Sequence, residues 1–198
     1  MDVKSRREEY AEATRGAIVD AAVVRFTADG YAGANIDSIA EVARVTKGAV
    51  YHHFADKADL FEAAYVSMEE RLLARVLEGV AGIDDPRRAL LAGADVFLRE
   101  CCEPDFRRIA LEEAPVALGW VRWKASEEQY FLGLLGAALD AMAGAGLITI
   151  PAGDDLTARM LLAALDDAGL AVGASADPGP ERQRALDLVD RLLSGLAH

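Results

Sequence analysis

The sequence has few cysteines and no long apolar segment. Its two cysteines, Cys101 and Cys102, are adjacent, so they cannot build the disulfide framework that stabilises small secreted proteins. Charged residues interrupt every apolar stretch before it reaches the roughly 18 residues that a membrane-spanning helix requires. Residues 1–10 are mainly charged, unlike a signal peptide. These absences exclude the disulfide-rich and membrane-spanning classes and predict a cytoplasmic protein with no membrane partner.

The sequence also lacks a recognisable catalytic or metal-binding set. The three histidines and the adjacent cysteines do not have the spacing of metal ligands. We identify no Ser–His–acid arrangement and no glycine-rich loop for a phosphate. We therefore expect no enzyme activity, no cofactor and no metal. Cys101 and Cys102 could act as a redox sensor, but two small side chains packed near a helix end are the favoured interpretation.

The abundant residues favour helices. Alanine and leucine dominate, runs of β-branched residues are absent, and 53% of the residues are hydrophobic, with a mean hydropathy of +0.12. The 198 residues suffice for one sizeable domain or two small ones. We predict an all-α fold of about nine helices, with a domain boundary between residues 57 and 58.

Charge is distributed unevenly across that boundary. The net charge of the chain is −12, of which residues 1–57 carry −1 and residues 58–198 carry −11. Lys4, Arg6 and Arg7 give residues 1–13 the character of a basic arm. An acidic body would repel a polyanion and confine its contact to the N-terminal part.

Apolar spacing and helix breakers predict where the helices lie. Gly30 should end the first helix in a left-handed conformation, and Pro86, Pro104 and Pro115 should each begin a helix. Asp154 or Asp155 should cap the eighth. The expected helices cover approximately residues 15–29, 36–43, 47–54, 57–80, 86–102, 104–110, 115–143, 155–172 and 181–196.

Residues 35–56 have the pattern of two short helices joined by a tight turn. Asn35 is a suitable N-cap for the first helix, and Thr46 is one for the second. Ile36 and Ile39 share the apolar face of the first helix. Arg44 then begins the turn, so the segment is predicted to be a helix-turn-helix.

The second helix of this motif has an unusually polar face. Val50 and Phe54 lie four residues apart and can anchor it to the core. Its other face carries hydrogen-bond donors and a glycine, groups that can contact phosphates and base edges in a DNA groove. A solvated helix face is the alternative interpretation. The candidate DNA-binding residues are Asn35, Arg44, Thr46, Lys47, Gly48, Tyr51, His52 and Lys57.

Residues 15–61 resemble the DNA-binding domain of the tetracycline-repressor (TetR) family. The matching elements are the Phe26…Gly30-Tyr31 helix end, the Ile36…Ile39-Ala40 helix, the KGAVYHHF helix at 47–54 and Lys57…Leu60-Phe61. The family often has Thr at the position of Asn35 and an acid at that of Ser38, so the reciprocal capping box is weaker here.

The resemblance implies how the two parts of the chain work. Residues 1–57 would form a three-helix DNA-binding domain, and residues 58–198 a helical domain for ligand binding and dimerisation. The last two helices would pair with those of a second copy in a four-helix bundle. Two recognition helices would then read a palindromic operator, which requires a separation of about 34–36 Å. The expected apolar stripes of these two helices are Met160, Ala164, Leu165, Ala168, Val172, Leu186, Val189, Leu192, Leu193 and Leu196.

A cluster of aromatic residues in the second part indicates a cavity for a small apolar effector. Ordinary packing is the alternative for each residue taken singly. Asp166 lies in the middle of an otherwise apolar helix, where it could anchor a ligand or a basic side chain. The candidate ligand-binding residues are Met68, Phe97, Trp120, Trp123, Tyr130, Met160 and Asp166.

The sequence therefore predicts a ligand-responsive transcriptional regulator, and specifically a repressor that its effector releases from the operator. The fourth helix, which spans both parts, would transmit the signal. Two other classes stay open at this point. One is a helical small-molecule sensor with a vestigial DNA module, and the other is a cytosolic enzyme working in the aromatic cavity. The sequence does not identify the operator, the effector or the regulated genes.

Overall fold

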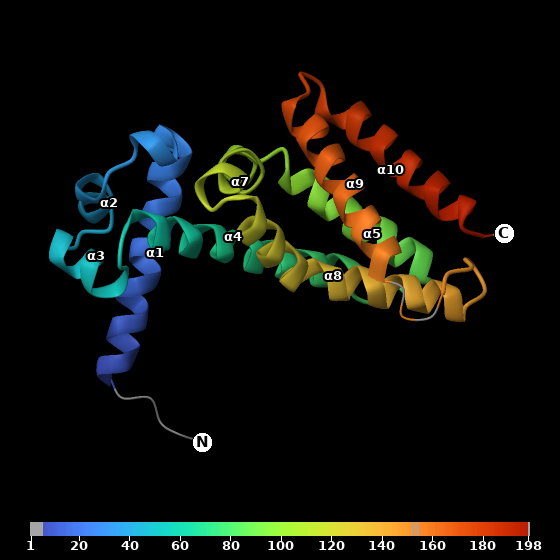
Figure 1. The fold of residues 1–198 in the computed structure, drawn as a ribbon, viewed down its shortest axis with the longest axis horizontal. Coiled ribbons are helices and arrows are strands. Elements are labelled where there is room, and N and C mark those ends of the chain that lie inside the picture. Colours follow the sequence, from blue (N-terminus) through green and yellow to red (C-terminus); the bar gives the residue numbers. More distant parts are fainter. Residues whose placement is uncertain (1–5, 152, 154, 198) are drawn as a thin grey trace.

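A computed structural model describes residues 6–151, 153 and 155–197, and within them every regular element is a helix. Three elements, α6, η1 and α7, follow one another without a break, so the described residues form nine helical segments. Figure 1 shows their arrangement. This confirms the predicted all-α fold. The elements are α1 (Arg6–Gly33), α2 (Ile36–Val42), α3 (Lys47–His53), α4 (Lys57–Val80), α5 (Pro86–Glu100), α6 (Pro104–Phe106), the π-helix η1 (Arg107–Glu113), α7 (Ala114–Ala117), α8 (Trp120–Gly144), α9 (Asp155–Ala174) and α10 (Pro178–Gly195).

The first helix begins earlier than expected. Residues 6–13 are helical, whereas the sequence predicted a polar arm there. Glu8 and Glu9 lie in the first turn, where their charges favour the positive end of the helix dipole. Gly30 ends the regular helix with a φ of +73°, as predicted. Lys4, which belonged to the predicted arm, lies outside the described residues.

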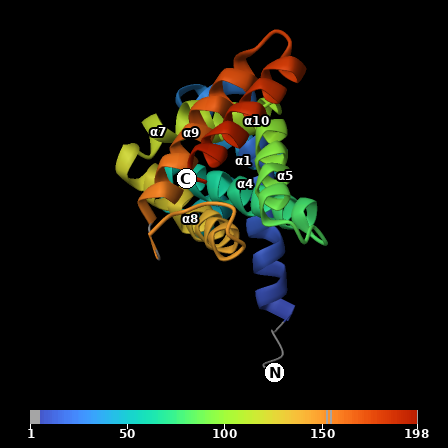
Figure 2. The same cartoon turned by 90° about the vertical axis from the view of Figure 1, so that its right-hand side faces the viewer.

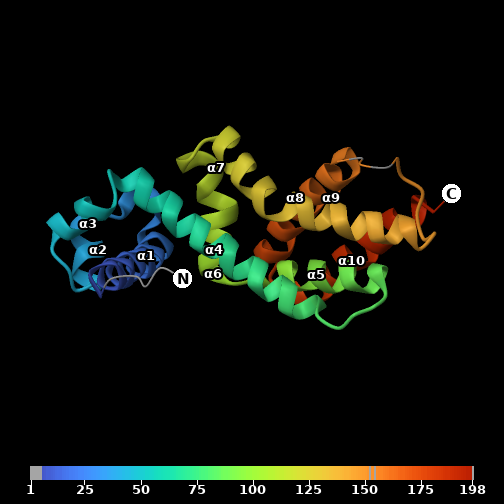
Figure 3. The same ribbon diagram turned by 90° about the horizontal axis from the view of Figure 1, so that it is seen from below.

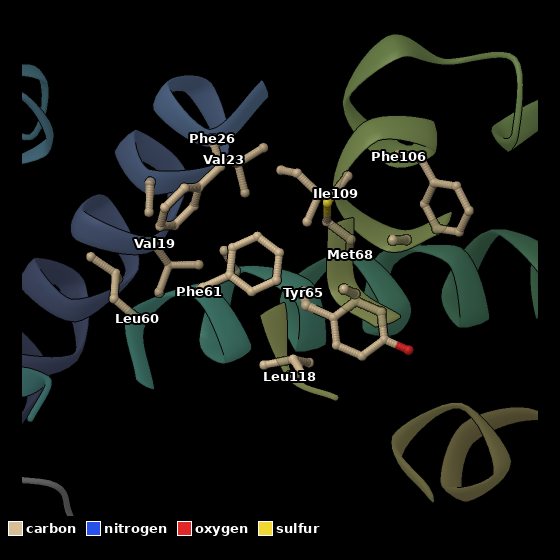
Figure 4. Packing of buried hydrophobic residues seen from close by; sticks show 14 of the residues in the cluster. Val19, Val23, Phe26, Leu60, Phe61, Tyr65, Met68, Phe106, Ile109 and Leu118 are labelled. Atoms are coloured by element: carbon tan, nitrogen blue, oxygen red, sulfur yellow. The ribbon is translucent and has the colours of Figure 1, made fainter. Parts of the chain in front are cut away.

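An aromatic cluster holds α1 against α4. The Phe61 ring packs edge-on against Phe26 and Tyr31, with centroid distances of 5.0 and 5.1 Å. Phe26 and Phe61 are completely buried, and Figure 4 shows them between the two helices. Such pairs add roughly 0.5–1.5 kcal/mol beyond the free energy of burying their area. The cluster therefore gives α2 and α3 a rigid support.

Helix α4 connects the two halves of the molecule. It runs from the α2–α3 end to the helices of the C-terminal half (Figures 1 and 3), and it packs on both α1 and α5. The stripe predicted to be buried is confirmed, and consists of Leu60, Ala64, Met68, Leu72 and Val76. A displacement at one end of α4 can therefore reach the other end.

The predicted helix start at Pro115 is wrong. Pro115 lies inside the continuous α6–η1–α7 segment, and the break comes at Gly119, whose φ is +79°. In a π-helix the N–H of residue 115 would bond to the carbonyl of Ala110, but proline has no N–H. The indole N–H of Trp123 donates to that carbonyl at 3.1 Å instead. Since α8 supplies this replacement donor, the proline is tolerated within the segment.

Helices α9 and α10 lie side by side on the outside of the C-terminal half (Figure 2). Leu165, Val172, Val189 and Leu193 are buried within the same chain. Exposed apolar side chains lie on the other faces of the two helices, and these include Met160 and Leu170 on α9 and Leu188 and Leu192 on α10. Most of the predicted apolar stripes therefore pack within the chain, and Met160 and Leu192 are the members that face outward.

Helix α9 begins at Asp155, and Asp154, the other predicted cap, lies outside the described residues. Within the part of the chain that the structure describes, every helix is too short or too polar to cross a membrane.

Candidate DNA-binding surface and effector cavity

Side-chain caps define the ends of α2 and α3. The Asn35 carboxamide oxygen accepts the backbone N–H of Ser38 at 2.9 Å, and the Thr46 hydroxyl accepts that of Ala49 at 3.2 Å. Both caps were predicted, and each contributes about 1 kcal/mol. The Ser38 hydroxyl donates to the Asn35 carbonyl rather than completing a capping box. Arg44 makes the turn with a φ of +57°.

Helix α3 has one anchored side and one exposed side. Val50 and the capping residue Phe54 are 1% and 2% exposed, and the Arg15 guanidinium lies over the Phe54 ring at 5.0 Å. The exposed predicted residues on and beside this helix are Arg44, Thr46, Lys47, Gly48, Tyr51 and His52. The structure therefore brings these six together on one end of the molecule, where α2 and α3 form its tip (Figure 3).

The two lysines of this region have different environments. The Lys47 ammonium donates to the Asp37 carboxylate at 2.8 Å, and both side chains are more than half exposed. The hydrogen bond to Asp37 and the charge of Asp37 raise the pKa of Lys47. An exposed pair of this kind contributes little to stability and is readily exchanged for another anion.

Lys57, a candidate DNA-binding residue, makes hydrogen bonds within its own chain. Its ammonium donates to the carbonyl oxygens of Tyr31 at 2.8 Å and Ala34 at 3.2 Å, and lies 4.7 Å from the centroid of the Tyr31 ring. Because the regular helix ends at Gly30, these carbonyls have no hydrogen-bond donor within it, and the Lys57 ammonium supplies one. Lys57 therefore fastens the end of α1 to the start of α4.

A cavity of about 120 Å³ lies in the C-terminal half. Its wall is mainly apolar, with contributions from α4, α5, α6, η1, α8 and α9. Three of the predicted ligand-binding residues line it, and these are Phe97, Trp123 and Asp166.

The other four predicted ligand-binding residues lie elsewhere. Trp120 and Met160 are 64% and 67% exposed, since Trp120 begins α8 at the surface and Met160 lies on the outer face of α9. Met68 is buried in the core next to α1, and Tyr130 packs beside that core. Aromatic composition alone could not distinguish the two faces of α8.

Three carboxyl groups interrupt the apolar wall. Glu69, Glu127 and Asp166 are 4%, 6% and 8% exposed, and all three line the cavity. The Lys124 ammonium donates to Glu127 at 2.5 Å and to Asp166 at 3.0 Å. Tyr65 adjoins this group, with its ring among apolar side chains and its hydroxyl at the edge of their cluster (Figure 4).

Burial raises the pKa values of two of these carboxyls, those of Glu69 and Glu127. Burial, followed by the charge of Asp166, raises the pKa of Glu69 to about 8, and the nearby Tyr65 hydroxyl opposes this shift. Burial and interaction with Asp166 raise the pKa of Glu127 to about 9, and Lys124 opposes that shift. At neutral pH both carboxyls are therefore mainly protonated in the empty cavity.

The sequence prediction included Asp166 but missed Glu69 and Glu127. In both cases the sequence contained a signal that the acid lies on a buried face of its helix. Glu69 lies four residues after Tyr65 and three before Leu72, so it falls on a buried stripe of α4. Glu127 lies four residues from the buried Trp123 on α8. Acids at core positions of a helix indicate a polar site inside the fold.

A second contact joins the two halves of the molecule. The Tyr31 backbone N–H, just after Gly30, donates to the Glu113 carboxylate at the end of η1. Arg108 also pairs with Glu113, at 3.3 Å. Phe106, Ala110 and other residues of the same segment line the cavity. The cavity wall and the end of α1 are therefore two ends of one helical segment.

The cysteines are packed rather than poised for chemistry. The Cys101 side chain is completely buried, and burial is the main cause of a raised pKa of its thiol. The Cys102 thiol donates to the Leu98 carbonyl at 3.4 Å. A thiol that stays protonated is a poor nucleophile. Among the described residues, no three His, Cys, Asp or Glu side chains form a group that could hold a metal ion.

Comparison with known proteins gives two matches to family models. Residues 18–64 match the model described as "Bacterial regulatory proteins, tetR family". Residues 87–196 match the model described as "Tetracyclin repressor-like, C-terminal domain". Together the two models cover most of the chain, including the helix-turn-helix and nearly all of α5 to α10.

Individual proteins agree with these matches. The HTH-type transcriptional regulator TtgR of Pseudomonas putida is 41% identical over 81 residues, which cover 40% of this chain and 39% of TtgR. A TetR-family regulator from Pectobacterium atrosepticum has the same fold, with a TM-score of 0.80, 23% identity and coverage of 98% and 97%. The regulator FadR of Bacillus subtilis, solved with stearoyl-CoA, gives a TM-score of 0.75 at 18% identity, covering 92% and 99%.

Proposed function

This chain belongs to the TetR family of helix-turn-helix transcriptional regulators, and from that membership we propose that it is a repressor released from a palindromic operator by a small molecule. Residues 1–57 would be the DNA-binding domain, and residues 58–198 the ligand-binding and dimerisation domain. The observation that supports this best is the two-sided α3, whose apolar residues are anchored while its polar residues are exposed.

The exposed face of α3 suits the major groove. A Cβ at Gly48 would meet only the Thr46 hydroxyl, at 3.8 Å, so packing within the chain does not require a glycine there. Glycine costs roughly 1 kcal/mol inside a helix, and close approach of the backbone to DNA is a reason for it. Lys47 can exchange Asp37 for a phosphate, while Tyr51 and His52 can donate to phosphates or base edges.

The other predicted DNA-binding residues have different roles in the proposed DNA binding. Arg44 and Thr46 border the same face, and Arg44 can contact a flanking phosphate. Asn35 uses its oxygen to cap α2 but keeps its amide group for donation. Lys57 is not included, because carbonyl groups of the chain occupy its ammonium.

We further propose that two copies pair through α9 and α10. Large apolar side chains are exposed along the outer faces of both helices, including Met160, Leu170, Leu188 and Leu192. A self-complementary surface of this kind fits a symmetric dimer, in which each patch meets its own copy. The second copy supplies the second recognition helix that a palindromic operator requires.

Two routes connect the cavity to the DNA-binding surface. Glu69 lines the cavity on α4, and Leu60 and Phe61 of the same helix support α1. In addition, η1 lines the cavity and ends at Glu113, which binds the Tyr31 N–H. A ligand that displaces α4 or η1 would change the spacing of the recognition helices, with a coupling of about 1–3 kcal/mol.

The central experiment is operator selection from random duplexes, followed by affinity measurement on variants. We expect Lys47→Ala with Tyr51→Ala to weaken operator binding at least 100-fold, because a phosphate contact and a base-edge donor are lost. Unfolding in urea should change by less than about 0.5 kcal/mol, since both side chains are exposed. The matched control is Arg88→Ala, an exposed cation on α5. Equal affinity of the double variant and the control would remove α3 from its proposed role.

Salt dependence gives an independent readout. If each subunit neutralises about three phosphates, the logarithm of the binding constant should fall with the logarithm of salt at a slope of about −5. The double variant should show a shallower slope. A selected site without two-fold symmetry would contradict the palindromic operator.

The dimer is tested by placing like charges at its centre. Leu188→Asp with Leu192→Asp should raise the dimer dissociation constant at least 100-fold in sedimentation velocity, because each charge meets its own copy across the axis. Operator affinity should fall with it. Leu77→Asp, an exposed leucine on α4, is the control. A dimer that survives the double substitution must use another surface.

A further inference from the structure

The wall of the cavity has more acidic than basic groups. Glu69, Glu127 and Asp166 face a space lined otherwise by apolar side chains, and Lys124 is the base in contact with them. From this arrangement we infer that the effector is an amphipathic organic cation, an aromatic or aliphatic body with one positively charged nitrogen that binds beside Glu69. The inference rests on the proposed function, which makes this cavity the effector site.

The hydrogen bonds within the cluster leave specific atoms open. Lys124 occupies one oxygen of Glu127 and one of Asp166. Asp166 Oδ1, Glu69 Oε2 and the Tyr65 hydroxyl have no hydrogen-bond partner at good geometry, although the Tyr65 hydroxyl lies close enough to Glu69 to lower its pKa. Glu69 is 4% exposed, so little bulk solvent reaches its carboxyl group. An ammonium group has three donors and matches such a set of acceptors.

The acids are not explained by the stability of the fold. Burying a carboxyl group without a partner costs several kcal/mol, and apolar residues of similar size would pack there at lower cost. Glu69 receives no ion pair from Lys124, the base of this cluster. The carboxyls lie in the wall of a cavity and not in a packed interior. A ligand that compensates for the cost of burying them therefore explains why they are there.

The apolar part of the cavity limits the body of the ligand. Phe97, Phe106, Trp123 and Phe131 contribute aromatic surface to the wall. Aromatic faces attract cations, and they pack well against another ring. A cavity of about 120 Å³ is close to the about 150 Å³ of an engineered cavity that binds benzene. The ligand therefore carries about one ring, unless the cavity opens further.

Binding of a cation would be linked to loss of protons. The raised pKa values of Glu69 and Glu127 mean that both carboxyls hold protons at neutral pH in the empty cavity. A cation stabilises the ionised forms and displaces these protons. The other groups facing the cluster are Tyr65 on α4, Lys124 on α8, Asp166 on α9 and the Cys101 thiol at the end of α5. Lys124 stays charged, because the carboxyls beside it more than offset its burial and raise its pKa.

The test compares three probes of similar size and different charge. Phenethylamine is a cation, 2-phenylethanol is neutral, and 3-phenylpropionate is an anion at neutral pH. Their binding to the full-length protein is measured by calorimetry without DNA. We expect phenethylamine to bind at least tenfold more tightly than the alcohol, and the anion to bind more weakly than either. The affinity for phenethylamine should rise from pH 6 to pH 8.5, with proton release seen in buffers of different ionisation enthalpy.

Variants assign the effect to Glu69. Glu69→Gln should weaken the binding of phenethylamine at least tenfold and leave the binding of 2-phenylethanol unchanged. Glu78→Gln, an exposed carboxyl on the same helix, should change neither. Asp166→Asn provides a second variant, which should also weaken the cation selectively. Circular dichroism and thermal melting establish that each variant is folded.

The outcomes separate this inference from the proposed function. Equal binding of amine and alcohol, no binding of the amine, or an unchanged amine affinity in Glu69→Gln and Asp166→Asn would overturn the inference. The operator affinity of the same preparations is then measured with and without amine. Selective amine binding without any operator binding would leave the cation site intact and refute the proposed regulator.

Discussion

The two ends of α4 differ in where the chain places its polar groups. At the N-terminal end, polar side chains of α3 are exposed over an apolar support, and Lys47 is paired only with the exposed Asp37. At the other end, Glu69, Glu127 and Asp166 are buried in an apolar wall. Exposed polar groups cost little stability and are free to meet a partner. Buried acids cost stability, so they point to a ligand inside the fold.

The two regions should therefore respond differently to substitution. In the N-terminal region, stability and binding should belong to different residues, because the aromatic cluster supports the fold and the outer face of α3 is the proposed DNA-binding surface. In the cavity, the same carboxyls affect both stability and ligand affinity. Three experiments test this difference.

Phe61→Ala should destabilise the N-terminal region most. The ring is completely buried between α1 and α4, and truncation of such a ring costs about 3–5 kcal/mol. Urea unfolding followed by circular dichroism measures this. Val24→Ala, at a position that is 57% exposed on α1, should change stability by less than about 0.5 kcal/mol. A loss below about 1 kcal/mol for Phe61→Ala would show that the aromatic cluster is not the support of α3.

The buried carboxyls should make the protein less stable as pH rises. The pKa of Glu69 is about 8 in the folded protein, against 4.5 for the free side chain. Between these values the folded state holds a proton that the unfolded state has lost, so the free energy of unfolding falls with pH. The slope is at most about 1.4 kcal/mol per pH unit for one carboxyl. Above about pH 8 the contribution of Glu69 is constant, and Glu127 extends the fall to about pH 9.

Urea unfolding from pH 5 to pH 9.5 checks this dependence. Glu69→Gln mimics the protonated carboxyl, so it should reduce the slope and make the variant more stable than the original protein at pH 9. Glu78→Gln should leave the slope unchanged. A stability that rises with pH over this range would mean that Glu69 is ionised and paired in the empty cavity.

Lys57→Ala should separate the two lysines of the N-terminal region. The Lys57 ammonium donates to two backbone carbonyls, and hydrogen bonds from charged groups contribute about 1.5–3 kcal/mol. We expect a loss of about 1–2 kcal/mol in urea unfolding and a small change in operator affinity. Lys47→Ala should instead weaken operator binding and change the stability in urea only slightly. If Lys57→Ala instead weakened operator binding at unchanged stability, Lys57 would contact a phosphate.

Much of the fold could be predicted because its signals are local. Helix caps at Asn35 and Thr46, the glycine at residue 30 and the apolar stripe of α4 act over a few residues, and the structure confirms each. The wrong start at Pro115 has a non-local cause. Its missing N–H is compensated by Trp123, eight residues further along the chain on the next helix.

The candidate site was predicted less evenly. The exposed residues of α3 follow from the pattern of the motif, because Val50 and Phe54 fix which side faces inward. The cavity residues do not follow from aromatic composition. Trp120 and Trp123 are three residues apart, yet one is exposed and the other lines the cavity.

Spacing along one helix sets which residues share a side, so the sequence was sufficient to predict most of the helices, their caps and the polar face of α3. The packing of helices from distant parts of the chain was needed to show that Lys57 binds carbonyls near the end of α1. The same holds for Glu113, which joins η1 to the end of α1. The packing also decided that Glu69, Glu127 and Asp166 meet at one cavity. These three acids come from α4, α8 and α9, and their mutual distances depend on how whole helices pack. No pattern within a single helix encodes that packing. The packing raises the pKa values of Glu69 and Glu127 and leaves Glu69 Oε2 and Asp166 Oδ1 without hydrogen-bond partners.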